Sequence, residues 1–408
     1  MERDSRDRAP SAGVLHVASQ WPRRRRLAVP EPETALETAA APFRADHVGS
    51  LLRPAALAAL RVKFKAGAAD TSTLVAAEDE AIAQAVQQQR DVGLKSITDG
   101  EFRRDWWHLD FLGQLDGVTL ASNEGPKFRI AGQEQPPIAT VTGRIGCSRP
   151  LMADHFAYLK SLTDKTPGVM PKMTIPSPSM LHLRGGRAAI SAEAYPDLDA
   201  FWDDVASAYR RAIAHLAAAG CQYLQLDDVA FAYLCDPKVQ ATCRANGDDP
   251  TTLPRTYARV INAALAERPA GMRVTIHTCR GNFKSAWVAE GGYEPVVEAM
   301  FSTDVDGWFM EFDNARAGGF EPLAVLRDAG AAAKKVVLGL VTTKLGELES
   351  KDDLKRRIDE ASRFVPLAQL CLSPQCGFSS THHGNALSQD DQWRKLERVV
   401  EVANEVWG

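Results

Sequence analysis

The sequence lacks any apolar run close to the length of a membrane-spanning helix, and neither charge sign is in large excess. A span needs about 20 consecutive apolar residues, so we expect no association with a membrane. Lysine and arginine number 48 against 52 aspartate and glutamate, which gives a formal net charge of −4 over 408 residues. This balance offers no basic footprint for a polyanion, and we expect no nucleic-acid partner.

Cysteine is scarce and odd in number, with seven residues at irregular spacing. Disulfide-stapled proteins are usually short and use even numbers of cysteines, so the pattern favours reduced thiols in a cytoplasmic protein. Cys221, Cys235 and Cys371 stand among apolar residues, and we interpret them as core thiols. Thiolates are also the soft ligands that zinc favours.

The first 42 residues have no apolar period and differ from the rest of the chain. A basic run at 23–26 is flanked by Pro, Ala, Glu and Ser. A signal peptide would need an apolar core after its basic start, and the following LAVPEPETALETAA lacks one. The composition predicts a disordered tail over 1–42, or a start codon placed too early. A nucleic-acid or targeting role for the arginine run is the alternative.

No Gly-rich G-x-G-x-x-G motif follows the first candidate strand, which disfavours a dinucleotide-binding fold. From Phe43 onward, short β-rich runs alternate with longer amphipathic stretches, an alternation typical of a parallel sheet covered by helices. Eight runs are predicted as strands: 44–50, 95–101, 171–177, 222–228, 273–279, 307–313, 335–341 and 367–373. Eight such units predict an α/β protein with one (β/α)8 TIM-type barrel over 43–408. The segment 105–150 exceeds this count and predicts extra loops or a hairpin.

Helix-end signals mark three of the stretches between or after these strands. The stretch 197–220 has acidic residues in its first turns and ends at a glycine. Ser350 with Asp353 resembles a capping box, and 388–407 keeps its apolar residues on one stripe. We predict a helix over each stretch.

In a barrel of this type, side chains at the carboxyl ends of the strands converge on one open face. His277 and Cys279 alternate at the end of the fifth strand and therefore point the same way. Glu311 ends the sixth strand, and Cys376 lies in a Pro-Gln-Cys-Gly turn after the eighth. One His, two Cys and one Glu suit Zn²⁺ rather than Mg²⁺ or Ca²⁺. Alone, H-x-C is usually structural, and a neighbouring arginine could also neutralise Glu311.

Three further strand ends are polar: Gly49-Ser50 closes the first, Asp99 to Glu101 the second, and Asp227-Asp228 the fourth. Acidic groups beside a metal can orient the amine of a substrate. Salt bridges to the arginines that lie nearby in sequence are the alternative interpretation.

Seven stretches resemble the catalytic barrel of the cobalamin-independent methionine synthase family and its short single-barrel relatives. They are HVGSLLRP (47–54), DGEFRRDWW (99–107), LQLDDVAF (224–231), HTCRGNF (277–283), MEFDNARAGGFEPL (310–323), VVLGLVTTKLGELE (336–349) and QLCLSPQCGFSS (369–380). The resemblance implies a zinc-dependent methyltransferase that methylates a homocysteine-like thiol to a thioether such as methionine, a role in methionine biosynthesis. It implies zinc at His277, Cys279, Glu311 and Cys376, and a thiol substrate bound by Gly49, Ser50, Glu101 and Asp227, with the two acids as catalytic residues.

Two departures from the family concern the methyl donor. Pro178 stands where the folate-using synthases carry a tryptophan that stacks on the pterin, and Lys344 stands where they carry a proton-donating histidine. Methyl transfer from methyltetrahydrofolate needs protonation of the leaving nitrogen, so we expect another donor, such as a methylcorrinoid protein.

Two other functions remain open from the sequence. One is a zinc-dependent alkyltransferase that adds a thiol such as coenzyme M to an epoxide, and the other is a non-catalytic, metal-stabilised binding barrel. Two pairs of residues near the expected site are also ambiguous. Trp106 and Trp107 either wall the pocket or pack the extra loops. His382-His383 could supply a proton or an alternative metal ligand, and we interpret them as an exposed loop pair.

Overall fold

The computed structural model describes residues 41–121, 137–328 and 334–408. The predicted tail therefore lies outside the described residues except for its last two positions. Ala41 is buried in a small cluster with Phe43 and Tyr223. None of the helices in the described ranges has the length and apolar content that crossing a bilayer requires.

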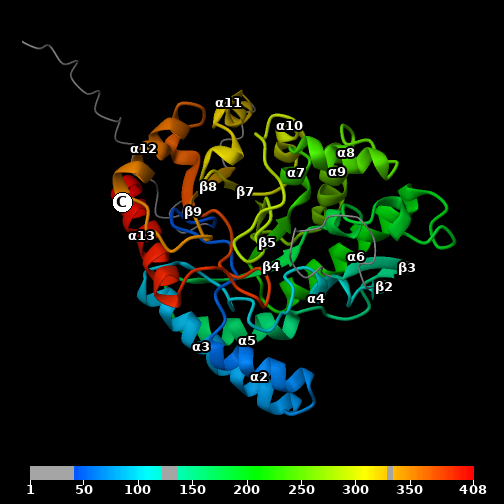
Figure 1. Ribbon diagram of the computed structural model, residues 1–408, viewed down its shortest axis with the longest axis horizontal. Helices are drawn as coiled ribbons and strands as arrows, with labels where there is room; N and C mark the ends of the chain where they lie inside the picture. The colour runs from blue at the N-terminus through cyan, green and yellow to red at the C-terminus, as the bar shows by residue number, and fades with distance from the viewer. Residues whose placement is uncertain (1–40, 122–136, 329–333) are drawn as a thin grey trace, which may run out of the picture.

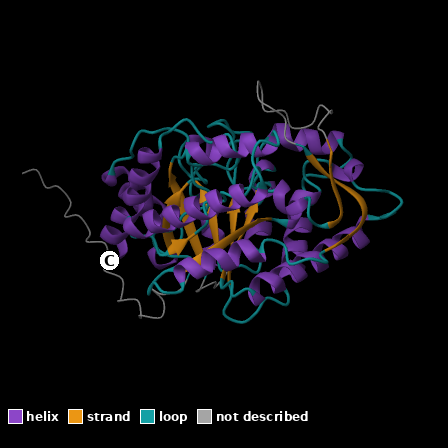
Figure 2. Cartoon of the chain, turned by 90° about the horizontal axis from the view of Figure 1, so that it is seen from below, coloured by secondary structure: helices purple, strands orange, loops and turns teal. Residues whose placement is uncertain are grey.

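A curled sheet of seven parallel strands occupies the centre of the molecule (Figures 1 and 2). In spatial order its strands are β1 (Ser96–Ile97), β4 (Met170–Pro176), β5 (Tyr223–Asp228), β6 (Arg273–Thr278), β7 (Gly307–Glu311), β8 (Lys335–Val341) and β9 (Leu370–Pro374). Neighbours follow the chain order, and helices lie outside the sheet, as predicted. These features confirm the single-domain TIM-barrel fold.

The segment predicted as the first strand, 44–50, is not a regular strand. It forms one parallel bridge to β9, between Ala45 and Leu372. The buried carboxylate of Asp46 accepts hydrogen bonds from the backbone N–H groups of Phe43 (3.1 Å) and His47 (2.8 Å). A side chain that binds nearby backbone groups competes with the strand ladder, so this segment closes the ring without extended pairing.

The second predicted strand is shortened to two residues for a related reason. After β1 the chain turns through Gly100 and Glu101, whose φ angles are +65° and +60°. The Asp99 carboxylate accepts a hydrogen bond from the backbone N–H of Glu101 at 2.9 Å. The chain thus leaves the sheet before the predicted end of the strand and presents the Glu101 side chain to the barrel mouth.

Helices surround the sheet, and the three helices predicted from end signals begin where predicted. They are α2 (Ala55–Lys65), α3 (Thr71–Asp91), α4 (Leu109–Leu112), α5 (Ala153–Thr163), α6 (Leu198–Ala218), α7 (Ala230–Tyr233), α8 (Pro237–Ala245), α9 (Leu253–Leu265), α10 (Val297–Phe301), α11 (Ala324–Asp328), α12 (Lys351–Ser362) and α13 (Gln389–Trp407). The Asp197 side chain caps α6, and Gly220 follows that helix with φ +93°. Ser350 caps α12, while the reciprocal capping box occurs at the start of α13.

The extra segment between the first two sheet strands contains an antiparallel hairpin, which was one of the two predicted alternatives. Strands β2 (Asp116–Ala121) and β3 (Ile138–Gly146) form it, and it lies at one end of the molecule beside α6 (Figure 1). β3 also bridges to the loop after β4 through Val141 and Ile190. The hairpin therefore supports the loop that follows β4, one of the loops over the barrel mouth.

Candidate metal centre and substrate pocket

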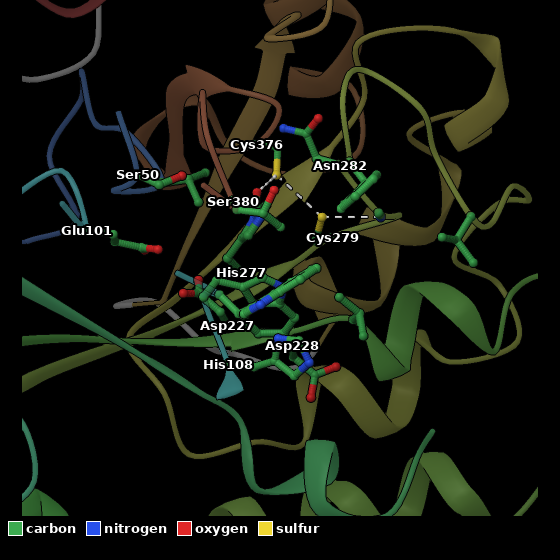
Figure 3. Close-up of a pocket in the computed structure, with 18 of the residues that line it drawn as sticks. Ser50, Glu101, His108, Asp227, Asp228, His277, Cys279, Asn282, Cys376 and Ser380 are labelled. Atoms are coloured by element: carbon green, nitrogen blue, oxygen red, sulfur yellow. Dashed lines mark hydrogen bonds between the residues drawn. The ribbon is translucent and has the colours of Figure 1, made fainter. Parts of the chain in front are cut away.

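Four potential metal ligands from three strands meet at the carboxyl end of the barrel. They are His277 in β6, Cys279 just after it, Glu311 at the end of β7 and Cys376 in the turn after β9. All four are buried, and one ligand atom from each lies within 4.8 Å of the others. The structure thus brings together the four residues that the sequence singled out (Figure 3 labels three of them).

The two thiols are in contact. Cys279 Sγ and Cys376 Sγ lie 3.4 Å apart, and the backbone N–H of Gly281 donates to Cys279 Sγ at 3.2 Å. The hydrogen bond from Cys279 and the nearby His277 hold the pKa of Cys376 well below its ordinary value. The same pairing, together with burial, raises the pKa of Cys279.

Glu311 is fully buried, and burial raises the pKa of its carboxyl group. One of its oxygens accepts a hydrogen bond from the backbone N–H of Arg280 at 2.9 Å, and the other lies 3.4 Å from Arg316 Nη2. The alternative prediction, that a neighbouring arginine neutralises Glu311, is therefore confirmed in part. Arg316 is shared with Asp313 at 3.2 Å, so the glutamate does not have this cation to itself.

The geometry of these four residues decides whether they can hold a zinc ion. Both ring nitrogens of the buried His277 have no hydrogen-bond partner among the described residues, which is costly unless a ligand satisfies one of them. Tetrahedral zinc with Zn–S bonds of about 2.3 Å sets two sulfurs roughly 3.8 Å apart. The Sγ–Sγ distance of 3.4 Å needs little widening to reach this value. The residues fit a zinc ion.

Two carboxylates line the pocket beside the cluster. Glu101 Oε1 accepts a hydrogen bond from Thr174 Oγ1 at 2.8 Å and lies 3.7 Å from Arg104, whereas its Oε2 is buried without a partner in the described part of the chain. Asp227 accepts a hydrogen bond from Gln225 at 2.6 Å. The salt-bridge alternative thus holds weakly for Glu101, and no ion pair of Asp227 is found among the described residues.

Both carboxyl groups are harder to ionise than usual. Burial raises the pKa of Asp227 to about 7, with the neighbouring Glu101 contributing. Burial likewise raises the pKa of Glu101. A pair of buried acids without a full counter-charge is stabilised by a cation from a ligand, and an ammonium group is such a cation.

Ser50 lines the same pocket at the seam of the barrel, whereas the preceding Gly49 is not part of the lining. Gly49 has φ +136°, and a Cβ there would lie 2.8 Å from the Thr174 methyl group, so the position requires glycine. Ser50 packs against Gly377, where a Cβ would lie 2.0 Å from Ser50 Oγ. This close contact holds Ser50 directly beside the turn that carries Cys376.

The pocket also contains residues that sequence reasoning did not select. Besides the expected residues, its lining includes His108, Arg184, Tyr233, Asn282 and Phe283. Asn282 Nδ2 donates to the Gly377 carbonyl at 2.8 Å and so ties the loop after β6 to the Cys376 turn. In Figure 3, His108 lies below the acidic residues, while Asn282 lies beside the thiols.

The structure shows where the two tryptophans and the two histidines with ambiguous interpretations lie. Trp106 and Trp107 both line the pocket, so they act as walls. His382 and His383 are half-buried beside Trp106, with ring centroids 5.7 and 5.8 Å from it. The interpretation of the histidines as an exposed loop pair was therefore wrong, because the indole covers them.

The two residues that depart from the family pattern lie outside the pocket lining. Pro178 begins a buried 3-10 turn, η1 (Pro178–Leu181), after β4. Lys344 is 5% exposed, and its ammonium group donates to the Gly281 carbonyl at 3.2 Å. Its charge lies near Glu311 and lowers the pKa of that acid against the larger effect of burial.

A parallel barrel with a buried His-Cys-Glu-Cys cluster at its strand ends is typical of catalytic domains that bind a metal ion. Residues 43–405 match the family model described as the catalytic domain of cobalamin-independent synthase, and the chain belongs to this family. It is 46% identical over 382 residues to the uncharacterized protein YxjG of Bacillus subtilis (strain 168), covering 93% of this chain and 98% of that protein.

More distant similarity links the chain to proteins with stated activities. A crystal structure of a candidate vitamin-B12-independent methionine synthase from Listeria monocytogenes aligns with a TM-score of 0.72 at 40% identity, covering 90% of this chain and 99% of that one. The 5-methyltetrahydropteroyltriglutamate–homocysteine methyltransferase of Thermosynechococcus vestitus is 25% identical over 358 residues, or 86% of this chain and 42% of that protein.

Proposed function

We propose that the protein is a zinc-dependent methyltransferase that binds a homocysteine-like thiol, activates it as a thiolate and methylates it to a thioether such as methionine. His277, Cys279, Glu311 and Cys376 would hold the zinc. The observation that carries the proposal is this buried cluster, with an unpartnered histidine, at the wall of a pocket that also holds two acids. The relatives with methionine synthase names support the same reaction.

A bound zinc ion supplies a lowered pKa for the substrate thiol, so that the nucleophile is a thiolate near neutral pH. The residues of the chain bind and orient the substrate. Glu101 and Asp227 would pair with its ammonium group, while the backbone and hydroxyl of Gly49-Ser50 would bind its carboxylate. Such an arrangement fixes the sulfur in one position relative to the methyl donor.

The acidic pair also distinguishes between the candidate functions. Coenzyme M carries a sulfonate and no amine, so two buried carboxylates beside the thiol site would disfavour it. An amino-acid thiol neutralises them. A non-catalytic barrel would have no use for acids whose ionisation is opposed by burial.

The test is direct binding of the thiol to the metal. Purified protein should contain close to one zinc per chain, and homocysteine should add a sulfur ligand detectable by zinc K-edge absorption spectroscopy. Binding should release a proton, because a thiol becomes a coordinated thiolate. A zinc edge that no amino-acid thiol alters would overturn the proposal, and a response to coenzyme M alone would transfer it to the epoxide alkyltransferase.

A further inference from the structure

The pocket is also lined by a cation, Arg184, which has no part in the proposed thiol site. This residue lies in the loop between η1 and a second 3-10 turn, η2 (Gly186–Ala189). It is the one lysine or arginine among the described residues that line the pocket. Its Nε is buried without a partner, and the described part of the chain gives its guanidinium no hydrogen bond or ion pair.

Different charged groups act on Arg184 and on the acid Asp227. The charged and ionisable groups that act on it are Tyr233 and Cys279, whereas those that act on Asp227 are Glu101, His277 and Arg104. A desolvated guanidinium without a counter-ion is unfavourable, and its planar fork matches a carboxylate. Arg184 therefore requires an anionic group from a ligand at a place that the amine-binding acids do not reach.

Aromatic rings form another part of the wall of this pocket. Trp106 stacks on Phe283 with ring centroids 6.1 Å apart and planes 11° from parallel, and Trp107 lies 4.5 Å from the His108 ring. All four residues line the pocket. Aromatic faces attract methylated onium groups, whose positive charge is spread over their methyl groups.

Beside Arg184, the described residues offer no side chain suited to protonate a poor leaving group. His108 is buried, with both ring nitrogens unpartnered among the described residues, and burial, followed by the charge of Arg184, lowers the pKa of His108 well below its ordinary value. Burial raises the pKa of the Tyr233 hydroxyl group. Lys344 binds the Gly281 carbonyl and does not line the pocket. A donor that leaves without taking up a proton fits this environment.

We propose that Arg184, with the wall of Trp106, Trp107 and Phe283, binds the methyl donor, and that this donor is a small zwitterion carrying a methylsulfonium group and a carboxylate. The inference rests on the proposed function, since it assigns the second substrate of that reaction. The carboxylate would pair with Arg184, and the sulfonium would lie against the rings with one methyl group toward the thiolate.

The transfer is balanced without any further reactant. The thiolate sulfur forms a bond to the methyl carbon while the bond from that carbon to the donor sulfur breaks. The electron pair of the broken bond stays on the donor sulfur, which becomes a neutral thioether. One negative and one positive charge disappear together, so no proton moves, and the negatively charged ligand cluster favours approach of the positive methyl group.

The test measures donor binding to the zinc-loaded protein by tryptophan fluorescence and calorimetry. Dimethylsulfoniopropionate carries both groups, trimethylsulfonium lacks the carboxylate, and 3-(methylthio)propionate lacks the positive charge. Arg184→Gln should weaken binding of the zwitterion about tenfold or more and leave trimethylsulfonium within twofold, while Arg184→Lys should restore part of the loss. Arg255→Gln, at an exposed position on α9, is the matched control and should change neither.

Several outcomes would overturn the inference while leaving the thiol site intact. One is that Arg184→Gln weakens homocysteine binding instead, which would place Arg184 in the acceptor site. Others are equal losses for all three probes, or no binding of the zwitterion by protein that binds homocysteine on zinc. Turnover with methylcobalamin, methyltetrahydrofolate or trimethylammonioacetate, but with no sulfonium, would assign a different donor.

Discussion

The sulfur atoms of Cys279 and Cys376 lie 3.4 Å apart, although 97 residues separate the two positions in the chain. One follows β6 and the other follows β9, so the contact exists because the sheet curls and brings the ends of its strands together. Sequence-distant thiols meeting with a buried histidine and glutamate constitute the strongest chemical feature of the described structure.

Loss of either thiol should remove the zinc. We expect Cys376→Ser and Cys279→Ala to retain less than about a tenth of the wild-type zinc, because a hydroxyl or methyl group is a far poorer ligand than a thiolate. Elemental analysis of purified protein measures this content. Cys147→Ser is the control, since Cys147 is a buried thiol that donates to the Arg149 carbonyl and is not one of the four clustered ligands. Full zinc in both site variants would refute the assignment.

The acids should affect the thiol substrate and not the metal. Glu101→Gln and Asp227→Asn should each weaken homocysteine binding about tenfold or more, because each removes a charge that pairs with the ammonium group. Calorimetry with zinc-loaded protein gives the affinities, and zinc content should stay unchanged. A thiol without an amine, such as 3-mercaptopropionate, should bind both variants and wild type equally well; a loss of zinc would instead make these residues part of the metal site.

Methyltetrahydrofolate should be a poor methyl donor. Pro178 and Lys344 stand where a stacking ring and a proton donor are expected, and neither lines the pocket. Methionine formation from homocysteine with the monoglutamyl form should therefore stay within a few-fold of background. Efficient turnover would contradict this reasoning and would give Lys344 or His383 a role as proton donor, which Lys344→Ala and His383→Ala would then locate.

The stability of the protein should depend on pH through Asp227. Its pKa is about 7 in the folded protein against an ordinary value of 3.8, so between these values the folded state holds more protons than the unfolded state. Stability then falls as pH rises from about 4 to about 7, and the loss is complete above pH 7. Three pKa units correspond to at most about 4 kcal/mol.

Asp227→Asn cannot ionise and should lose this decline. Relative to wild type, it should be more stable at pH 8 than at pH 4 when unfolding is followed with urea in the presence of a chelator and without substrate. Asp199→Asn, at a side chain that is 92% exposed, serves as the control. Equal differences in unfolding free energy at both pH values would show that Asp227 is already ionised.

Removal of residues 1–40 should leave the melting temperature and thiol binding nearly unchanged, because that segment has little apolar content to pack. Removal of residues 1–43 should lower the melting temperature by a few degrees. The longer deletion takes away Ala41 and Phe43, which are buried beside Tyr223. A large effect of the shorter deletion, measured by calorimetry, would mean that the tail packs on the barrel.

Much of the fold could be predicted because parallel strands buried on both faces read as apolar runs. The run 335–341 corresponds to β8 without an error at either end. The prediction of a regular strand at 44–50 was wrong, because the buried carboxylate of Asp46, and not local propensity, decides the hydrogen bonding of this segment. Seven of the eight predicted strands form the sheet, whereas the way in which the segment 44–50 closes the barrel depends on contacts that no local pattern reveals.

The candidate ligands could be found because alternation within a strand and position at its end fix where a side chain points. Arg184 and His108 could not be found in this way. They lie in irregular loops, in LHLRGG and DWWH, where the sequence gives no period to follow. The position of Trp106 depends on its stacking with Phe283, which is distant in sequence. The structure was therefore needed to decide whether Trp106 walls the pocket or packs the extra loops.

The way the ring closes has a consequence for the precision of the site. Asp46 joins the seam by accepting from Ser96 Oγ at 2.6 Å and Tyr223 OH at 2.8 Å, with Lys172 Nζ 3.3 Å away. Four residues along the chain, Ser50 is bonded through its carbonyl to the N–H of Phe378. The backbone at Ser50, which we propose binds the substrate, and the turn that carries Cys376 are therefore held by the same hydrogen-bonded network. Substitutions of Asp46 or its partners would then change the position of the Cys376 thiol without contacting it.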